Sequence, residues 1–318
     1  MSEHKSDTPP PKVCFLIPSL NHAKFSSATL DSVFASTYPN IHVVVCDDAS
    51  TDNNLDILKA ARDKYGFTLL NNRTRLGVNA TLNRCFAACP DADFYYAIAT
   101  DDVLDPLMVE ACLGIMNERP EIDVLLGSHT VIDAAGNRLR SVKVSGSYDG
   151  ARIKLRSPWE EFHASFQFHR GSFARAAYPL PEDMLGEDHY FFHFAIFNEF
   201  NVTQTNIHFL LRRIHGSNAS TSRTITESVE RAVDRFRSFP QYNEIIRVGL
   251  RRQMLCTLPL SPWDRNKRRF ASEFIKDGFS LYLALYAASF LPGARIGASI
   301  GKWAVRKIRS TGSTSVSS

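Results

Sequence analysis

The fold is decided by the stretch VVVCDDASTD at residues 43–52, in which an apolar run of β-forming residues leads directly into two carboxylates and a polar turn. Ligands of open α/β sheets bind in the crevice outside the carboxyl ends of the strands. We therefore expect Asp47 and Asp48 to border a binding crevice, where a carboxylate can accept hydrogen bonds from a pyrimidine N–H group or from ribose hydroxyls. The alternative is that both residues cap the helix that follows.

On both sides of this stretch, short β-rich runs alternate with segments of helical period through the first 130 residues. This alternation predicts βαβ units and a mainly parallel sheet flanked by helices, which is the α/β class. Apolar residues recur every three or four positions in the helical segments, which indicates one buried face for each helix. The expected strands are residues 13–17, 41–46, 67–71, 94–99 and 123–126, and the expected helices contain residues 30–37, 78–89 and 108–115, with two more near 188–199 and 226–236.

The composition is that of an ordinary globular protein. The chain has 318 residues, of which 44% are hydrophobic and 22% charged, and its net charge of +4 is too small to indicate a nucleic-acid partner. The six cysteines lie mostly in apolar runs and form no C-x-x-C pair, so we expect buried free thiols. The polar, proline-rich start lacks the apolar core of a secretory signal, and we therefore expect a cytoplasmic protein.

The C-terminal part combines an apolar segment with a basic one. Residues 279–291 are nearly free of charge, but Pro292, Gly293 and Arg295 interrupt them before the length of about 20 residues that a bilayer-spanning helix needs. Basic residues, and no acidic ones, follow to the end of the chain. We expect residues 279–309 to lie at the cytoplasmic face of a membrane, with the alternative that they pack on the protein's own core.

A second acidic pair ends another apolar run. Residues 95–102 have the sequence YYAIATDD, so Asp101 and Asp102 follow a predicted strand as Asp47 and Asp48 do. Adjacent carboxylates repel each other unless positive charge lies near them, and a divalent cation such as Mg²⁺ or Mn²⁺ that bridges diphosphate oxygens would supply it. The alternative is again a helix N-cap, which is harder to reconcile with two such strand ends in one sheet.

Four short motifs follow one another along this half of the chain. They are LIPSLN at residues 16–21, DDASTD at residues 47–52, LGVNA at residues 76–80 with Asn83 after it, and ATDD at residues 99–102. In type, order and spacing they resemble the successive nucleotide-sugar motifs of family 2 glycosyltransferases, which have the GT-A fold. The resemblance extends more weakly to about residue 222.

The resemblance implies a nucleotide-sugar donor, with UDP as the default nucleotide, and a divalent metal, Mn²⁺ or Mg²⁺. Many family members carry an acid where this chain has Ala99, so Asp102 is the one carboxylate of its motif that is implied to bind the metal. The residues implied to contact the nucleotide sugar are Pro18 and Ser19 beside the base, Asp48 as an acceptor from the base, Asp101 near the ribose, and Arg75 and Asn79.

The sequence LGEDHY at residues 185–190 resembles the Glu-Asp motif of the same family. Inverting transfer needs a base that removes the proton of the acceptor hydroxyl, and the resemblance gives this role to Asp188. Glu187, Gly171 and Ser172 are implied to contact the acceptor. The alternative is that the two acids only complement the positive end of a helix dipole.

The sequence RRIHGSNAS at residues 212–220 resembles a family segment that follows the catalytic helix. In that segment a histidine ligates the metal or touches the diphosphate, which makes His215 a metal-ligand candidate. The alternative is a structural histidine, the commoner role of a single one.

These features predict an inverting glycosyltransferase that moves a sugar from a nucleotide-diphosphate sugar to a hydroxyl of a saccharide or lipid-linked acceptor, in polysaccharide or glycan biosynthesis. The alternative is a non-catalytic nucleotide-sugar-binding or membrane scaffold protein. A dehydrogenase and a nucleotidyltransferase are disfavoured because no glycine-rich loop follows the first strand. The expected domains are a disordered tail at 1–11, a GT-A domain at 12–222 with a nucleotide-sugar half at 12–130 and an acceptor half at 131–222, a helical extension at 223–309, and a disordered tail at 310–318.

Overall fold

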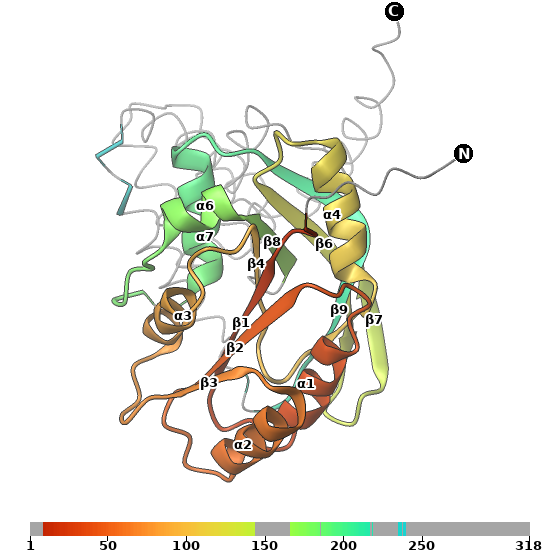
Figure 1. The fold of residues 1–318 in the computed structure, drawn as a ribbon, viewed down its shortest axis with the longest axis vertical. Helices are drawn as coiled ribbons and strands as arrows, with labels where there is room; N and C mark the ends of the chain where they lie inside the picture. The colour runs from red at the N-terminus through yellow and green to blue at the C-terminus, as the bar shows by residue number, and fades with distance from the viewer. Residues whose placement is uncertain are drawn as a thin grey trace, which may run out of the picture. The chain divides into compact units, whose positions relative to one another are not determined.

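The described part of the chain folds around one mixed β-sheet (Figure 1). The structure is a computed structural model that describes residues 9–143, 166–184, 186–216, 218, 235–236 and 238–239, all of which belong to one compact unit. Its strands are β1 (Val13–Ser19), β2 (Ile41–Asp47), β3 (Thr68–Asn71), β4 (Phe94–Ala97), β5 (Val103–Leu104), β6 (Val124–Ile132), β7 (Arg138–Val142), β8 (Gln167–Arg170) and β9 (Val202–Arg213), and its helices are α1 (Ser26–Phe34), α2 (Asn54–Tyr65), α3 (Val78–Ala87), α4 (Met108–Glu118), α6 (Gly171–Ala177) and α7 (Glu187–Phe197).

The strand order of the sheet is β3-β2-β1-β4-β8-β6-β9-β5, and β7 pairs with β6. β1 runs parallel to both β2 and β4, and β3 runs parallel to β2. β8 is antiparallel to its neighbours β4 and β6, whereas β6 and β9 are parallel. The predicted α/β class is therefore confirmed, with a parallel sheet from β3 to β4 and a mixed sheet from β8 onward.

The five expected strands correspond to β1 to β4 and β6. The expected helices that contain residues 30–37, 78–89 and 108–115 correspond to α1, α3 and α4, and the helix expected near 188–199 corresponds to α7. Of the helix expected at 226–236, the structure describes only residues 235 and 236. The expected extension at 223–309, its membrane segment at 279–309 and the tail at 310–318 lie outside the described residues, apart from four residues between 235 and 239. Among the described residues, no helix has the length and apolar character that crossing a membrane requires.

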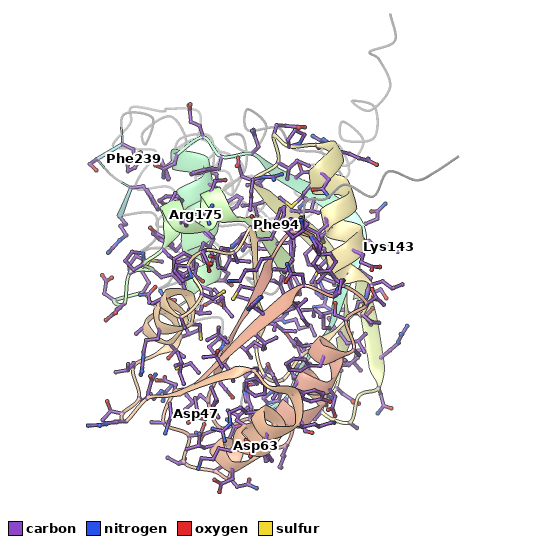
Figure 2. All side chains as sticks on the ribbon, viewed as in Figure 1. Asp47, Asp63, Phe94, Lys143, Arg175 and Phe239 are labelled. Carbon is purple, nitrogen blue, oxygen red and sulfur yellow. The ribbon has the colours of Figure 1, made fainter. Side chains whose placement is uncertain are left out.

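Helices cover both faces of the parallel strands, and side chains fill the space between (Figure 2). α1 and α2 lie side by side (Figure 1), and their buried Leu30 and Leu58 belong to the same apolar core as Phe15 on β1. Successive side chains of a strand point to opposite faces, so Cys14 faces away from this core. Cys14 contacts Cys89, just beyond the end of α3, which shows that α3 covers the other face.

Aromatic rings continue the core from the parallel half into the mixed half. Tyr96 on β4 makes edge-to-face contacts with Phe15 on β1 and Phe209 on β9, with ring centroids 5.7 and 5.9 Å apart. Phe94 on the same strand stacks on Phe168 of β8 at 5.5 Å. The predicted buried free thiols are confirmed for the cysteines that the structure describes, which are Cys14, Cys46, Cys85, Cys89 and Cys112.

The close approach of β6 and β9 depends on Gly127. A Cβ atom at this position would overlap the buried ring of Phe209, which the core holds in place. We expect Gly127→Ala to lower the free energy of unfolding by about 3 kcal/mol, the upper part of the usual range for an overpacked core. Urea unfolding followed by circular dichroism measures the change.

Gly114 provides the matched control, because it lies on the exposed side of α4 with nothing within 4 Å of an added Cβ. Gly114→Ala should raise the free energy of unfolding by about 0.5–1 kcal/mol, since alanine is the better helix former. Equal effects of the two substitutions would contradict the packing account of Gly127.

Candidate functional site

The carboxyl ends of the parallel strands meet at one edge of the sheet. In the strand register Ser19 lies beside Asp47, and Asp47 beside Asn71. The backbone connects the same edge beyond the strands, because the Asp48 amide donates to the Ser19 carbonyl at 2.8 Å and the Asn72 amide donates to the Asp47 carbonyl at 2.8 Å. The first acidic pair therefore lies where a ligand of a parallel sheet binds.

Asp47 organises the turn that leads from β2 into α2 (Figure 2). Its carboxylate accepts hydrogen bonds from the Ser50 amide at 2.8 Å, from the Ser50 hydroxyl at 2.6 Å and from the side-chain amide of Asn54 at 2.9 Å. Asn54 is the first residue of α2, and Asp47 is only 1% exposed. α2 begins after Asn53 without a side-chain cap hydrogen bond, so Asp47 holds the turn before the helix and does not cap the helix, contrary to the capping alternative.

Asp48 anchors the loop before α3. One carboxylate oxygen accepts from the Asn72 side chain at 2.7 Å and from the Leu76 amide at 2.8 Å, and the other accepts from the Gly77 amide at 2.9 Å. These bonds fix the loop that carries Arg75, whose side chain is exposed. The structure therefore gives Asp48, predicted as an acceptor from the base, a loop-positioning role.

A chain of hydroxyl groups connects β1 to the second acidic motif. The hydroxyls of Ser19 and Thr100 share a hydrogen bond of 2.9 Å, and Thr100 shares a second one, of 2.8 Å, with His22 Nδ1. Ser19 also accepts from the Asn54 side chain at 2.8 Å. Ser19 is buried, and the neighbouring Pro18 is partly exposed at this edge.

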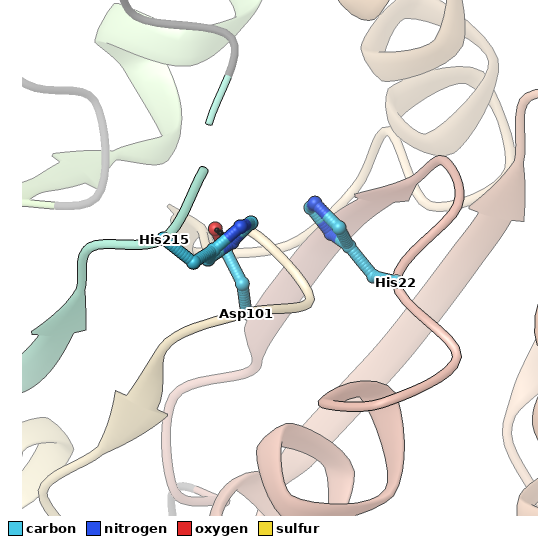
Figure 3. A group of neighbouring side chains, drawn as sticks. All are labelled: His22, Asp101 and His215. Carbon is cyan, nitrogen blue, oxygen red and sulfur yellow. Dashed lines mark hydrogen bonds and ion pairs between the residues drawn. The ribbon is translucent and has the colours of Figure 1, made fainter. Parts of the chain in front are cut away.

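Figure 3 shows three side chains that approach one another, His22, Asp101 and His215. Each offers one possible metal-ligand atom, and these atoms all lie within 4.8 Å of one another. His215 Nε2 and Asp101 Oδ2 are 2.9 Å apart. The three residues follow three different strands, β1, β4 and β9, so the fold brings together positions that are distant in the sequence.

Asp101 and His215 are held in place from several sides. The Asn218 side chain donates to Asp101 Oδ2 at 3.0 Å, and Arg213 Nε donates to the Asp101 carbonyl at 2.9 Å. The His215 ring packs on Phe25 with centroids 4.8 Å apart, and the Arg213 guanidinium lies 4.9 Å from the same phenyl ring. The pair is therefore pre-positioned by the chain itself.

Asp102 has a different environment from Asp101. It is 4% exposed, and its carboxylate accepts a hydrogen bond from the Arg213 backbone amide at 2.9 Å. Burial raises the pKa of Asp102 to about 8, and the neighbouring charge of Asp101 adds to the rise. Among the described residues, the group of possible metal-ligand atoms contains Asp101 and not Asp102.

The chemistry of the three-residue group fits a divalent metal. Burial lowers the pKa of His22, which favours the neutral imidazole that a metal ion binds. Imidazole nitrogens with one carboxylate oxygen suit Mn²⁺, Fe²⁺, Co²⁺ or Zn²⁺. The residues present therefore fit a divalent metal such as Mn²⁺, one of the two ions that the resemblance implied, with Asp101 in place of the expected Asp102.

The predicted base lies at the start of α7, where Glu187 and Asp188 are the acids of the first turn. Burial raises the pKa of Glu187 to about 7, and the charge of Asp188 contributes to the rise. The loop before this helix is tied to α3, because Asn79 donates to the Pro181 carbonyl at 2.7 Å and Asn83 donates to the Leu180 carbonyl at 2.8 Å. Asn79, predicted to contact the nucleotide sugar, thus connects α3 to the loop that precedes the acidic helix.

Gly171 and Ser172, predicted to contact the acceptor, begin α6. A Cβ at Gly171 would lie 2.6 Å from the carbonyl oxygen of Ala92, so a glycine is needed for the close packing of α6 on the segment before β4. Ser172 is exposed. Of the two, Ser172 has the accessible side chain.

Residues 14–175, half of the chain, match the model of glycosyl transferase family 2. The chain belongs to this family. The matched residues include both acidic pairs and extend into α6.

Relatives of this family 2 chain match over less than half of their own length. An uncharacterised glycosyltransferase of Rickettsia prowazekii (strain Madrid E) is 27% identical over 146 residues, which are 46% of this chain and 45% of the relative. Chondroitin synthase of Escherichia coli is 27% identical over 128 residues, 40% of this chain and 18% of that protein.

Solved glycosyltransferases share the GT-A fold with this family 2 chain. S. aureus TarS in complex with UDP-GlcNAc superposes with a TM-score of 0.65 at 16% identity and covers 95% of this chain and 92% of that one. The mannosyltransferase PcManGT from Pyrobaculum calidifontis, in complex with GDP-Man and Mn²⁺, superposes with a TM-score of 0.59 at 14% identity. The match covers 94% of this chain and 86% of PcManGT. These likenesses confirm the predicted fold.

Sequence reasoning missed His22 and Asn218 in the site of this family 2 domain. His22 directly follows the LIPSLN motif, and its proximity to that motif was the signal available. Asn218 lies within the RRIHGSNAS segment, but nothing local indicates that its amide reaches Asp101.

The anchoring role of Asp48 can be tested by substitution. In Asp48→Asn, an amide group replaces one of the oxygens that accept from the loop, so we expect the free energy of unfolding to fall by about 2 kcal/mol, the value of a hydrogen bond to a charged group. Urea unfolding measures this change. Asp63→Asn is the control, because Asp63 only pairs with Arg62 at the surface and should cost less than about 0.5 kcal/mol. An equally small effect at Asp48 would contradict the anchoring role.

Proposed function

We propose that this protein transfers a sugar from a nucleotide-diphosphate sugar to an acceptor hydroxyl with inversion at the anomeric carbon. The observation that carries the proposal is the Asp101–His215 pair at the carboxyl edge of the sheet, in a chain that belongs to glycosyl transferase family 2. A second acidic group, Glu187 and Asp188, begins α7, and Asn79 of α3 holds the loop before that helix. The Asp101–His215 pair would provide a place for the diphosphate, and the acidic residues at the start of α7 would provide the base. Both are needed for this reaction.

For the donor, we propose a nucleoside diphosphate sugar bound at the edge formed by β1, β2 and β4, with UDP as the nucleotide. TarS, which shares the fold, binds UDP-GlcNAc. Pro18 and Ser19 lie at this edge, and the exposed Arg75 guanidinium is available to a phosphate group. Asp48 would act through the loop that it holds, since its carboxylate already accepts three hydrogen bonds from the chain.

For the metal, we propose that Asp101 and His215 hold Mn²⁺ or Mg²⁺. The sequence favoured Asp102, but the buried Asp102 carboxylate accepts a backbone amide, whereas Asp101 Oδ2 lies within 2.9 Å of an imidazole nitrogen. When bound, such an ion offsets the negative charge that develops on the departing diphosphate. The Mn²⁺ bound to PcManGT supports this choice of ion.

For the base, we propose Asp188. The acceptor oxygen attacks the anomeric carbon from the side opposite the diphosphate, the bond from carbon to the diphosphate oxygen breaks, and its electron pair leaves with the diphosphate. Asp188 takes the proton of the acceptor hydroxyl as the new bond forms. Glu187, whose pKa burial raises to about 7, would contact the acceptor beside Asp188.

For the acceptor, we propose a saccharide or lipid-linked saccharide in polysaccharide synthesis, with Ser172 at its site. The chondroitin synthases of Escherichia coli and Pasteurella multocida among the relatives support a polysaccharide product. Contact of residues 279–309 with the cytoplasmic face of a membrane stays a prediction.

Asp188→Asn tests the base. Removing the carboxylate should lower the transfer rate by about 10²- to 10⁴-fold, the usual contribution of a positioned base, while leaving the dissociation constant for UDP unchanged. Radiolabelled sugar transfer and calorimetric UDP titration measure the two quantities. Asp183→Asn, at an exposed acid of the preceding loop, should leave the rate unchanged. Transfer by Asp188→Asn at the wild-type rate would rule out this assignment.

A thermal-shift screen tests the donor. UDP at 100 times its dissociation constant should stabilise the protein by about 2.7 kcal/mol through mass action. The rise in melting temperature should be larger with Mn²⁺ than with EDTA. Parallel samples with GDP, CDP and ADP identify the nucleotide. If none of these diphosphates raises the melting temperature with Mn²⁺ present, the proposed donor class is wrong.

A further inference from the structure

We propose that His22 is a third metal ligand, so that this protein holds a divalent ion through His22, Asp101 and His215 before any nucleotide binds. The proposal rests on the proposed function in one respect, because the same ion would later meet the diphosphate of the donor. It goes further in naming a residue of the first loop and in making metal binding independent of the nucleotide.

The distances among the three side chains suit one ion. Metal–nitrogen and metal–oxygen bonds of about 2.1 Å place two ligand atoms of the same ion about 3 to 4.2 Å apart. The 2.9 Å between His215 Nε2 and Asp101 Oδ2 is already that of neighbouring ligands. All three possible ligand atoms lie within 4.8 Å of one another, close to the upper limit of about 4.2 Å for two ligands of one ion.

The hydrogen bonds around His22 and Asp101 are those that support metal ligands. A metal-bound histidine donates its other ring N–H to an oxygen, which fixes the tautomer and the ring orientation. With a proton on Nδ1, His22 donates to Thr100 at 2.8 Å, and Nε2 carries the lone pair that binds an ion. Thr100 is itself fixed by Ser19, and Asn218 donates to Asp101 Oδ2.

The two imidazole rings also face each other in a suitable way. The centroids of His22 and His215 are 5.8 Å apart with the rings nearly perpendicular, as two ligands approaching one ion from different directions would be (Figure 3). Asp101 lies beside both. Two neutral imidazoles and one carboxylate would leave a divalent ion with one net positive charge, which attracts a diphosphate.

Three protein ligands have consequences for affinity and for the choice of ion. Mg²⁺ keeps most of its water and is usually bound through carboxylates together with substrate phosphates. Imidazole nitrogens favour transition metals instead. We therefore expect Mn²⁺ and Co²⁺ to bind the nucleotide-free protein, and Mg²⁺ to bind only when a nucleoside diphosphate is present.

Titration of the full chain with Mn²⁺ tests the proposal, with the electron paramagnetic resonance signal of unbound Mn²⁺ as the readout. We expect one bound ion per chain without nucleotide. His22→Asn keeps an amide that can hydrogen bond to Thr100 but removes the second ring nitrogen, so it should weaken Mn²⁺ binding at least about tenfold. His42→Asn, at an exposed histidine of β2, is the matched control and should bind as the wild type does.

Pulsed electron paramagnetic resonance of the Mn²⁺-loaded protein identifies the ligands directly. Two coordinated imidazole nitrogens are expected in the wild type and one in His22→Asn, and equal melting temperatures in EDTA verify that the variant is folded. Unchanged affinity and two nitrogens in His22→Asn would overturn the assignment of His22. Mn²⁺ binding only in the presence of UDP would overturn nucleotide-independent binding and leave the proposed function intact. Failure to bind Mn²⁺ even with UDP would refute both.

Discussion

The parallel pairing of β1 with β2 on one side and β4 on the other is the constraint on which the site depends. Parallel strands end at the same edge, and this pairing places Ser19, Asp47 and the segment after Ala97 side by side. The helices that make the crossovers cover both faces, so the edge is the part of these strands that stays accessible. The candidate site is assembled there because the polar residues follow the strands directly.

Burial decides what each acidic residue at this edge does. A carboxylate that is removed from water needs hydrogen bonds or nearby positive charge to replace its lost hydration. Asp47 and Asp48 receive these bonds from the turns that they hold, and Asp102 receives one from the backbone of Arg213. Asp101 instead has a histidine and an amide as partners, which a metal ion can join. Adjacent residues in one motif therefore have different roles.

α3 connects the two parts of the proposed reaction. Its first turn follows the loop that Asp48 anchors, and its Asn79 and Asn83 hold the carbonyls of the loop before α7. Cys89, just beyond the end of this helix, contacts Cys14 of β1. α3 thus lies between the loop that Asp48 anchors and the loop that precedes the helix of the proposed base.

The sequence predicted the α/β class, β1 to β4, the start of β6, the helices α1, α3, α4 and α7, both acidic pairs and the family, because strand and helix periods and strand-end carboxylates are local signals. It did not locate α2, β5 or β7. It did not determine β8, β9 or which acid of each pair faces a ligand. Those depended on contacts between distant positions, such as His215 with Asp101, 114 residues apart, and His22 with Thr100, 78 residues apart. Only tertiary structure decided that His22, Asp101 and His215 meet, since no local pattern encodes the convergence of three loops.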